Sequence, residues 1–470
     1  MKKNALFILS FILIAISACN DDDSTTAETT AVAFVNQTVN VIAAENTVNV
    51  VFSAPTTAAG TVVINVLTTD LVYGTDFTTN PAIINNTITL PFEANATSAT
   101  FSFTKLIDAI EGQVKNVKFT IASVSFEGIE VPEATNFIQL NFNETAIVAN
   151  ALSPENGGNK IPNQVYIDLS SGATTNVPRT SWDFGFYSGS DFRVVSNGAI
   201  NKFAVKQLNT TNIDEVQTAD PSVTTGNFDV ANLAYVDAPY GNLSGTAIAE
   251  IAANEADNKV YLVNLGDKVA TVAPGTATGV ALTGDARGWK KIRILRSGND
   301  YKFQYANIDA TTHSEIIISK NAAFNFSFFS FDVNTVVQAE PQKEKWDLNI
   351  TTFTNEVFQG PTPMGAYFYP DFAVTNTKAG TRAYQVFTSD FTYENFNLTN
   401  VVLDNLLTDL AKDQRAIGSN WRATVPLALK TDRFYVIKDV AGNIYKLKFT
   451  AMQNAEGERG HVSFEYKLLQ

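Results

Sequence analysis

Apolar and polar residues alternate along the chain from residue 31 to residue 148. The runs lie at residues 32–34, 39–41, 48–52, 62–66, 88–92, 101–103 and 119–121. A period of two places successive side chains on opposite faces of a strand, so each run predicts a strand with one buried face. Turn residues separate the runs, and the segment is therefore predicted to be an antiparallel β-sandwich.

The rest of the chain, residues 163–470, alternates in the same way but with more aromatic residues. RSGNDYKFQYANI (296–308) and DVAGNIYKLKFTAM (439–452) share a Gly-Asn pair, one further residue and then Tyr-Lys. The spacing predicts two β-hairpins in which Gly-Asn forms the tight turn and one aromatic face is buried.

A second motif repeats upstream of each hairpin. SWDFGF (181–186) precedes the first hairpin and KWDLNI (345–350) precedes the second. Two motifs in the same order predict two units of one fold, at residues 163–322 and 323–470. Residues 149–162 are rich in Asn, Gly and Pro and are predicted to form a linker. The predicted fold class is all-β, mostly antiparallel, with minor helix.

One segment has a helical period. Leu403, Leu406, Leu407 and Leu410 follow i, i+3, i+4, i+7 spacing, and Gly418 follows as a stop signal. The pattern predicts a helix that packs its leucine face against the second unit.

The first thirty residues predict export and anchoring. Lys2 and Lys3 precede an apolar run at residues 5–16, which is too short to span a bilayer and is typical of a signal peptide, here residues 1–18. The following Cys19 is the only cysteine of the chain, and Ile16-Ser17-Ala18-Cys19 resembles the lipobox of bacterial lipoproteins. Cys19 is therefore predicted to carry the lipid anchor.

The residues after Cys19 are acidic and small. Asp21, Asp22 and Asp23 resemble the signal with which Bacteroidota export lipoproteins to the cell surface. Residues 19–30 are predicted to be a flexible tether, because an acidic, Thr-rich tract cannot bury a core. The predicted location is the outer membrane, at the cell surface and lipid-anchored.

Composition narrows the classes of function. The 470-residue chain has a net charge of −14, which argues against nucleic acid as a partner, since phosphate binding needs clustered Lys and Arg. The chain has two histidines and no recognisable nucleophile or zinc-protease motif. Carboxylates are plentiful, but no motif marks a catalytic pair, and the chain is predicted not to be an enzyme.

Residues 31–148 resemble a Calx-β domain. The resemblance rests on Glu45, the turn Gly74-Thr75-Asp76-Phe77, Asp108 and Glu111. The family often binds calcium through clustered carboxylates. Gln113 and Lys115 stand where further acidic residues are expected. A structural spacer is therefore favoured over a calcium site.

The second unit resembles the HmuY family, haem-binding surface lipoproteins of Bacteroidota. The segments that carry the resemblance are FSFDVNTVV (329–337), KWDLNIT (345–351), GSNW (418–421) and residues 433–466. Residues 163–187 and the segment that follows resemble a second, more diverged copy. The resemblance implies an all-β fold that grips haem between loops, axial ligands from His or Met, and an outer-membrane transporter as partner.

The candidate haem ligands are few. Met364 lies in the aromatic stretch PTPMGAYFYPDF (361–372) with Tyr367 and Tyr369, which is either a ligand mouth or a packed crossover. His313 is either a ligand or a surface turn residue, and His461 is either a ligand or an ordinary residue of the last strand.

Two hypotheses of function follow. The first is a cell-surface lipoprotein that binds haem or a related tetrapyrrole and passes it to a transporter for iron acquisition. The alternative is a surface lipoprotein that keeps this scaffold for another ligand, such as a glycan or a protein partner, or for a structural role.

Overall fold

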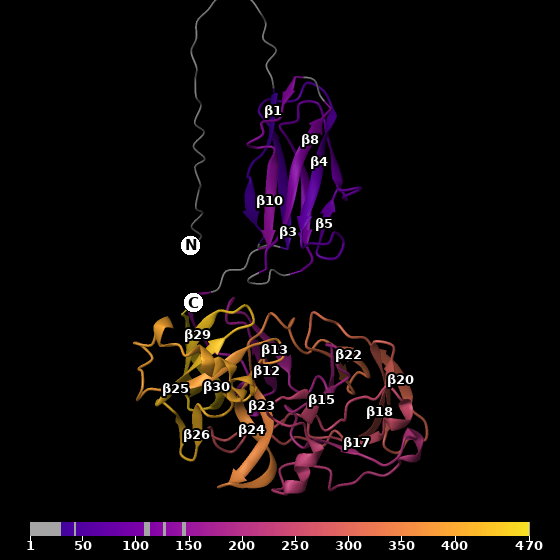
Figure 1. Ribbon diagram of the computed structural model, residues 1–470, viewed down its shortest axis with the longest axis vertical. Helices are drawn as coiled ribbons and strands as arrows, with labels where there is room; N and C mark the ends of the chain where they lie inside the picture. The colour runs from indigo at the N-terminus through magenta and orange to yellow at the C-terminus, as the bar shows by residue number, and fades with distance from the viewer. Residues whose placement is uncertain (1–29, 42–43, 108–112, 126–127, 143–146, 470) are drawn as a thin grey trace, which may run out of the picture. The chain divides into compact units, whose positions relative to one another are not determined.

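The structure is a computed structural model that describes residues 30–41, 44–107, 113–125, 128–142 and 147–469. Contacts divide the chain into two compact units, one ending at residue 143 and one beginning at residue 144. Both units are built almost entirely from antiparallel strands (Figure 1), which confirms the predicted all-β fold class. None of the described helices is long and apolar enough to cross a membrane.

The N-terminal unit is a sandwich of two five-stranded sheets, in the orders β5-β7-β3-β1-β9 and β2-β10-β8-β4-β6. Its strands are β1 (Thr30–Phe34), β2 (Thr38–Asn40), β3 (Glu45–Phe52), β4 (Gly60–Thr69), β5 (Phe77–Asn80), β6 (Thr87–Phe92), β7 (Ser98–Lys105), β8 (Lys115–Val124), β9 (Ile129–Glu130) and β10 (Phe137–Phe142). Every apolar run predicted as a strand lies in or beside one of them.

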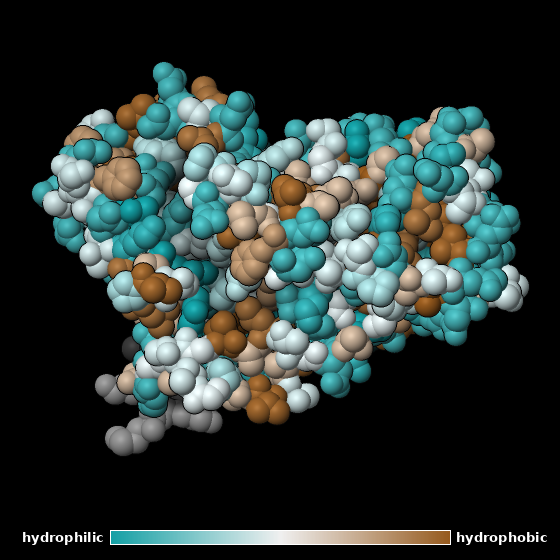
Figure 2. All heavy atoms as spheres, turned by 90° about the horizontal axis from the view of Figure 1, so that it is seen from below, coloured by the Kyte–Doolittle hydropathy of each residue, from teal (hydrophilic) through white to brown (hydrophobic). Residues whose placement is uncertain are grey.

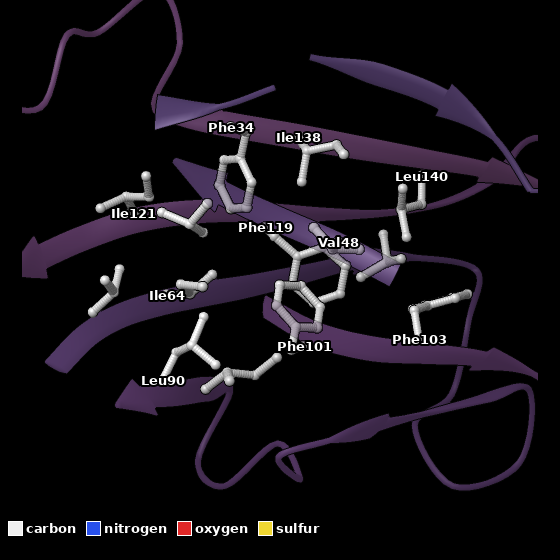
Figure 3. Packing of buried hydrophobic residues seen from close by; sticks show 14 of the residues in the cluster. Phe34, Val48, Ile64, Leu90, Phe101, Phe103, Phe119, Ile121, Ile138 and Leu140 are labelled. Atoms are coloured by element: carbon white, nitrogen blue, oxygen red, sulfur yellow. The ribbon is translucent and has the colours of Figure 1, made fainter. Parts of the chain in front are cut away.

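The two inner faces of this sandwich meet in one apolar core (Figure 3). Phe101 and Phe103 of β7 point inward with Phe119 of β8, and the rings of Phe101 and Phe119 lie 5.0 Å apart. The alternation in the sequence therefore corresponds to this buried face.

The C-terminal unit contains four larger sheets. Their orders are β13-β12-β23-β24, β15-β14-β21-β22, β16-β17-β18-β19-β20 and β11-β30-β29-β28-β25, and β26-β27 form a separate hairpin. The strands are β11 (Ala149–Leu152), β12 (Asn163–Ile167), β13 (Thr174–Pro178), β14 (Phe184–Tyr187), β15 (Val194–Ser196), β16 (Phe203–Gln207), β17 (Val260–Leu265), β18 (Trp289–Ser297), β19 (Asp300–Asn307), β20 (Ser314–Ile318), β21 (Phe326–Ser330), β22 (Thr335–Val337), β23 (Leu348–Gln359), β24 (Thr362–Thr375), β25 (Arg382–Phe387), β26 (Arg422–Thr424), β27 (Leu427–Leu429), β28 (Arg433–Lys438), β29 (Ile444–Gln453) and β30 (Arg459–Leu468).

The described helices are short. They are the 3₁₀ turns η1 (Gly158–Lys160), η2 (Ile213–Glu215), η3 (Val230–Tyr235), η4 (Leu243–Gly245), η5 (Glu255–Asp257), η6 (Leu398–Asn400) and η7 (Leu403–Leu407), and the α-helix α1 (Asp409–Lys412).

The predicted repeats exchange strands within this one compact unit. The β12–β13 hairpin of the first repeat pairs with β23 of the second, and the β21–β22 hairpin of the second pairs with β14 of the first. The register is the same in both places. Ile167 pairs with Leu348, which lies two residues after the tryptophan of its Trp-Asp motif, and Phe329 pairs with Phe184, which lies two residues after the tryptophan of the other motif. The two predicted repeats are thus packed into one compact body.

The two Trp-Asp motifs sit at equivalent places in this exchange. Trp182 packs edge-on against Phe328 at 4.7 Å, and Trp346 packs edge-on against Tyr166 at 4.9 Å. Each tryptophan therefore contacts an aromatic ring contributed by the other repeat, in one shared cluster between the sheets.

The first Gly-Asn hairpin has the predicted two-residue turn. Ser297 pairs with Asp300, and Gly298 adopts a φ of +62° at the first turn position. The second turn is longer, because Lys438 pairs with Ile444 and the Asp439 carboxylate accepts hydrogen bonds from the Gly442 and Asn443 N–H groups.

Gly298→Ala is expected to lower the free energy of unfolding by about 1–2 kcal/mol, because a side chain is disfavoured in the left-handed region. Chemical denaturation followed by tryptophan fluorescence measures this change. Gly275→Ala is the matched control, since Gly275 has no positive φ and no atom near its added Cβ. Equal effects of the two variants would contradict the assignment of strain to this turn.

Two segments differ from the patterns read in the sequence. Residues 149–152 of the expected linker form β11, which pairs with β30. The predicted leucine helix is wrong, because residues 403–412 form the 3₁₀ turn η7 followed by the single helical turn α1. Thr408 is the last residue of η7's cap and the first of α1's, and its hydroxyl accepts a hydrogen bond from the Ala411 N–H at the start of α1. Leu406 is buried, whereas Leu403, Leu407 and Leu410 are exposed, so the leucine spacing does not mark a packing face.

Candidate functional site

A long hairpin projects from the C-terminal unit. It consists of β23 and β24, and β12 pairs only with the first three residues of β23. Met364 is the extra residue of a bulge, because Gly365 pairs with Val357 and Pro363 pairs with Phe358. Bulges bend a strand and re-aim a side chain, and they occur often beside functional sites. We call this hairpin the arm.

A loop from the first repeat holds the arm. The Gly226 N–H donates to the Ala366 carbonyl, and the Ala366 N–H donates to Asn232 Oδ1. A Cβ on Gly365 would come within 2.4 Å of the Asp229 carbonyl oxygen, so only glycine permits this close approach.

The same loop presents an aromatic ring. Phe228 has a φ of +52°, a conformation that bulky residues rarely adopt, and its ring stacks on Tyr367 with centroids 5.6 Å apart. Phe228 is 56% exposed and Tyr367 is 39% exposed. The backbone of this loop thus holds a large apolar ring in solvent.

We use the name arm patch for the exposed and half-buried apolar residues of the arm and of this loop. Its members are Phe228, Val230, Phe358, Met364, Tyr367 and Tyr369. Seen from below the view of Figure 1, the surface of the C-terminal unit has brown apolar areas among hydrophilic ones (Figure 2). Exposed apolar surface of this kind marks binding sites for ligands or partners.

The structure brings Met364, Tyr367 and Tyr369 together on β24, and the Tyr367 and Tyr369 rings lie 5.6 Å apart. The two histidines lie elsewhere. His313 precedes β20, with its Nδ1 3.0 Å from Asp214 Oδ1, and His461 lies in β30, with its Nε2 3.8 Å from Glu458 Oε2. Met364, Tyr367 and Tyr369 thus share one strand, whereas neither histidine lies on the arm.

The charges beside the arm are already paired. Arg415 Nη1 donates to Asn355 Oδ1 on β23 at 2.9 Å, and the same guanidinium pairs with Asp413 and Glu356. Burial raises the pKa of Tyr369, and the Arg422 charge opposes this effect. The arm patch therefore offers ring faces and a thioether more than a free charge.

Several predicted residues lie outside the described ranges, namely Cys19, Asp21, Asp22, Asp23, Asp108 and Glu111. Glu45, Asp76, Gln113 and Lys115 are described. Among the described residues, no group of three or more His, Cys, Asp or Glu is placed to hold a metal ion.

The structure also contains a cavity that the sequence did not indicate. It lies between the sheets that carry β12–β23 and β14–β21, and its volume is about 160 Å³. Both motif tryptophans, Trp182 and Trp346, line it, as do Glu340 and Lys378.

Two ionisable groups of the cavity are strongly perturbed. Burial raises the pKa of Glu340 to about 8, although its Oε1 accepts hydrogen bonds from the Asn325 and Phe326 N–H groups. Burial lowers the pKa of Lys378 to about 8, against the opposing charges of Asp237, Glu340 and Asp413. Lys378 Nζ donates to Gln414 Oε1 at 3.0 Å.

Sequence reasoning had no signal for these cavity residues. Glu340 and Lys378 lie in loops without periodicity, and their burial depends on pairing between repeats that are distant along the chain. Of the patterns in the sequence, only the repeated Trp-Asp motif includes residues that line the cavity.

Comparison with protein families identifies the C-terminal unit. The model of the HmuY protein family matches residues 160–466, which is more than half of the chain. The chain belongs to the HmuY family. The match runs continuously through both predicted repeats and includes the arm and the residues that line the cavity.

Comparison with solved structures gives likenesses at low TM-scores. The apo-form Calx CBD1 domain has 17% sequence identity and a TM-score of 0.20, and the match covers 24% of this chain and 96% of that chain. A two-domain protein of unknown function from Bacteroides fragilis has 10% identity and a TM-score of 0.19, with 41% and 74% covered. No curated protein matches the chain significantly.

Proposed function

We propose that this protein is a lipid-anchored cell-surface binder of haem or a related tetrapyrrole, and that the arm patch holds the ligand. In this proposal Cys19 carries the anchor, Asp21 to Asp23 direct export, and an outer-membrane transporter receives the haem. Membership of the HmuY family supports the class of ligand. The chain acts as a carrier and catalyses no reaction.

The observation that carries the proposal is the placement of Met364. Its thioether is an established type of haem axial ligand, and Met364 is the extra residue of a bulge on the strand that also carries Tyr367, whose ring stacks on Phe228. Flat aromatic rings and apolar side chains suit the face of a porphyrin. The cavity of about 160 Å³ is too small for a porphyrin, since a cavity of about 150 Å³ binds a ligand of the size of benzene.

Met364→Leu tests the site, because it removes the sulfur and keeps the side-chain volume. Haemin is added to the mature chain and its Soret absorption is followed. We expect the variant to lose the six-coordinate spectrum and to bind haemin at least tenfold more weakly. Tyr367→Ala is expected to weaken binding while the spectrum of the remaining complex is kept.

Met452→Leu is the matched control, since Met452 is the other methionine after the signal peptide and is buried in the core. His313→Ala and His461→Ala complete the set. We expect all three to bind haemin as the parent does. Loss of the Soret shift in either histidine variant, with Met364→Leu unaffected, would place the ligand elsewhere and contradict the proposed site.

A further inference from the structure

The cavity between the exchanged hairpins has two kinds of unpartnered polar atom among its lining residues. Atoms of the first kind have essentially no accessible area, so a bound molecule cannot reach them. They belong to Gln164, Trp182, Trp346, Asn349 and Thr354. Glu340 Oε2 and the Tyr166 hydroxyl also lack a partner among the described residues, but they are not among the inaccessible atoms. Both residues are only 4% exposed and line the cavity, so a molecule inside it can reach these two oxygens.

The two carboxyl groups that line the cavity differ in their hydrogen bonds. Asp237 uses both oxygens, because Oδ1 accepts from the Ala247 N–H at 2.8 Å and Oδ2 accepts from the Ser196 N–H at 2.7 Å. Glu340 uses only Oε1, which accepts from two backbone N–H groups. Burial raises the pKa of Tyr166, and so does the charge of Glu340, which makes the two groups neighbours. Glu340 Oε2 is therefore left, beside a phenol, for a donor that the described residues do not supply.

The charges in the wall of the cavity do not balance. Lys378 is the one cationic side chain among the described residues that line it, and the Asp237 charge acts on Lys378 more strongly than the Glu340 charge does. One ammonium group thus faces two carboxyl groups. Burial raises the pKa of Glu340 to about 8, so this carboxyl group is mostly protonated at pH 7. A second cation in the cavity would favour its ionised form.

Aromatic rings make up much of the rest of the wall. Tyr166 meets Trp346 edge-on at 4.9 Å, and Trp182 meets Phe328 edge-on at 4.7 Å. Ring faces attract cations, and the attraction is strongest where the cation is desolvated. The volume of about 160 Å³ admits a molecule about the size of benzene. The size and the chemistry together favour a small organic cation.

The cavity reaches the surface at one end. Its wall there is a loop at residues 236–246, in which Asn242 lines the cavity and is exposed. Gln414 fastens this loop, since its Nε2 donates to the Pro239 carbonyl at 2.8 Å. Its Oε1 accepts from Lys378 Nζ at 3.0 Å, which holds the ammonium group of Lys378 on the same side. A small molecule can therefore enter past this loop.

We propose that the cavity binds a small primary amine as its ammonium ion. The ammonium group donates to Glu340 Oε2 and to the Tyr166 hydroxyl oxygen, and the carbon atoms of the amine contact the aromatic rings. Glu340 carries a negative charge in the complex and gives its proton to solvent on binding, so no further reactant is needed. This site is separate from the arm patch and does not depend on haem binding.

The test uses the mature chain with cyclopentylamine, which is about the size of benzene, and with cyclopentanol as its uncharged counterpart. Calorimetry at pH 7 follows each compound up to about 10 mM, which detects millimolar affinity. We expect saturable binding of the amine and binding of cyclopentanol that is weaker by about tenfold or more, because hydrogen bonds to charged groups are the stronger ones.

Amine binding is expected to release about one proton at pH 7, because the ammonium group favours the ionised form of Glu340. Burial lowers the pKa of Lys378 to about 8, so Lys378 contributes to this release. Burial raises the pKa of Asp237 to about 6, so Asp237 is already ionised at pH 7, and Tyr166 stays protonated. Calorimetry in buffers of different ionisation enthalpy measures the number of protons. A number near zero would contradict the proposal.

Two variants remove the two oxygens with little change of shape. Glu340→Gln removes the charge, and Tyr166→Phe removes a hydroxyl that has no partner among the described residues. We expect amine binding to weaken by about tenfold or more in the first and by about threefold or more in the second. Both are expected to keep at least the urea midpoint of the parent at pH 7. Glu315→Gln on β20 is the control and is expected to bind the amine as the parent does.

Any of three further results would overturn the proposal. They are the absence of saturable amine binding, amine binding that is unchanged in Glu340→Gln, and cyclopentanol binding as tight as that of the amine.

Discussion

Asp183→Asn is expected to lower the free energy of unfolding of the C-terminal unit by about 3 kcal/mol or more, because it breaks a buried ion pair. Arg287 Nη1 lies 2.6 Å from Asp183 Oδ1, and both side chains are almost fully buried. The Phe331 N–H also donates to Asp183 Oδ2. Asp332 remains beside Arg287, which places the loss near the lower end of the range for buried pairs.

The other repeat supplies a matched control at Asp347. This carboxyl accepts hydrogen bonds from the Leu169 N–H and the Thr381 hydroxyl and has no arginine partner among the described residues. Burial, together with Asp439 and Asp168, raises its pKa well above the usual value, and it has no ion pair with an arginine for the substitution to break. Asp347→Asn is expected to change stability by less than about 1 kcal/mol.

Urea denaturation followed by tryptophan fluorescence measures both variants. The four tryptophans of the chain all lie in the C-terminal unit, so the signal reports on that unit alone. If the two variants lost the same free energy of unfolding, the ion pair with Arg287 would make no contribution of its own, and the prediction would be contradicted.

Glu340→Gln is expected to remove a large pH dependence of stability. The pKa of Glu340 is raised from 4.5 to about 8 by burial, so between these values the folded protein keeps a proton that the unfolded chain has lost. The contribution of Glu340 to stability is therefore most favourable below pH 4.5, falls as the pH rises, and stops falling above about pH 8. Glutamine at this position does not titrate, so this pH dependence of stability is absent from the variant.

The stability difference between Glu340→Gln and the parent is expected to grow in favour of the variant by about 2–4 kcal/mol from pH 5 to pH 8. The Glu340 charge also raises the pKa of the neighbouring Lys378 and Tyr166, so the difference includes their response to the loss of that charge. Urea midpoints at each pH measure it, and Glu315→Gln on β20, where the side chain is 41% exposed, is the control. A pH-independent difference would contradict the raised pKa.

Much of the fold could be predicted from local pattern. A period of two depends only on which strand face is buried, so the N-terminal strands and the Gly298 hairpin are confirmed. The leucine helix failed because Thr408 divides the segment into two short turns, and a helical period alone does not show which side has a partner.

The exchange of hairpins between the repeats could not be read from the sequence. Matched motifs indicate duplication, but β12 pairs across 180 residues or more of chain with β23, and nothing local specifies that partner. The cavity and the buried Glu340 depend on this exchange and were missed with it. Residues 361–372 were expected to be a ligand mouth or a packed crossover, and Met364, Tyr367 and Tyr369 instead lie on one strand, β24.

Titration of haemin into the parent mature chain tests the proposed function most directly. The account predicts a saturable shift of the Soret band at about micromolar haemin, with one haem per chain and a six-coordinate spectrum. Absorbance that rises linearly without saturation, for both oxidised and reduced haem, would contradict it.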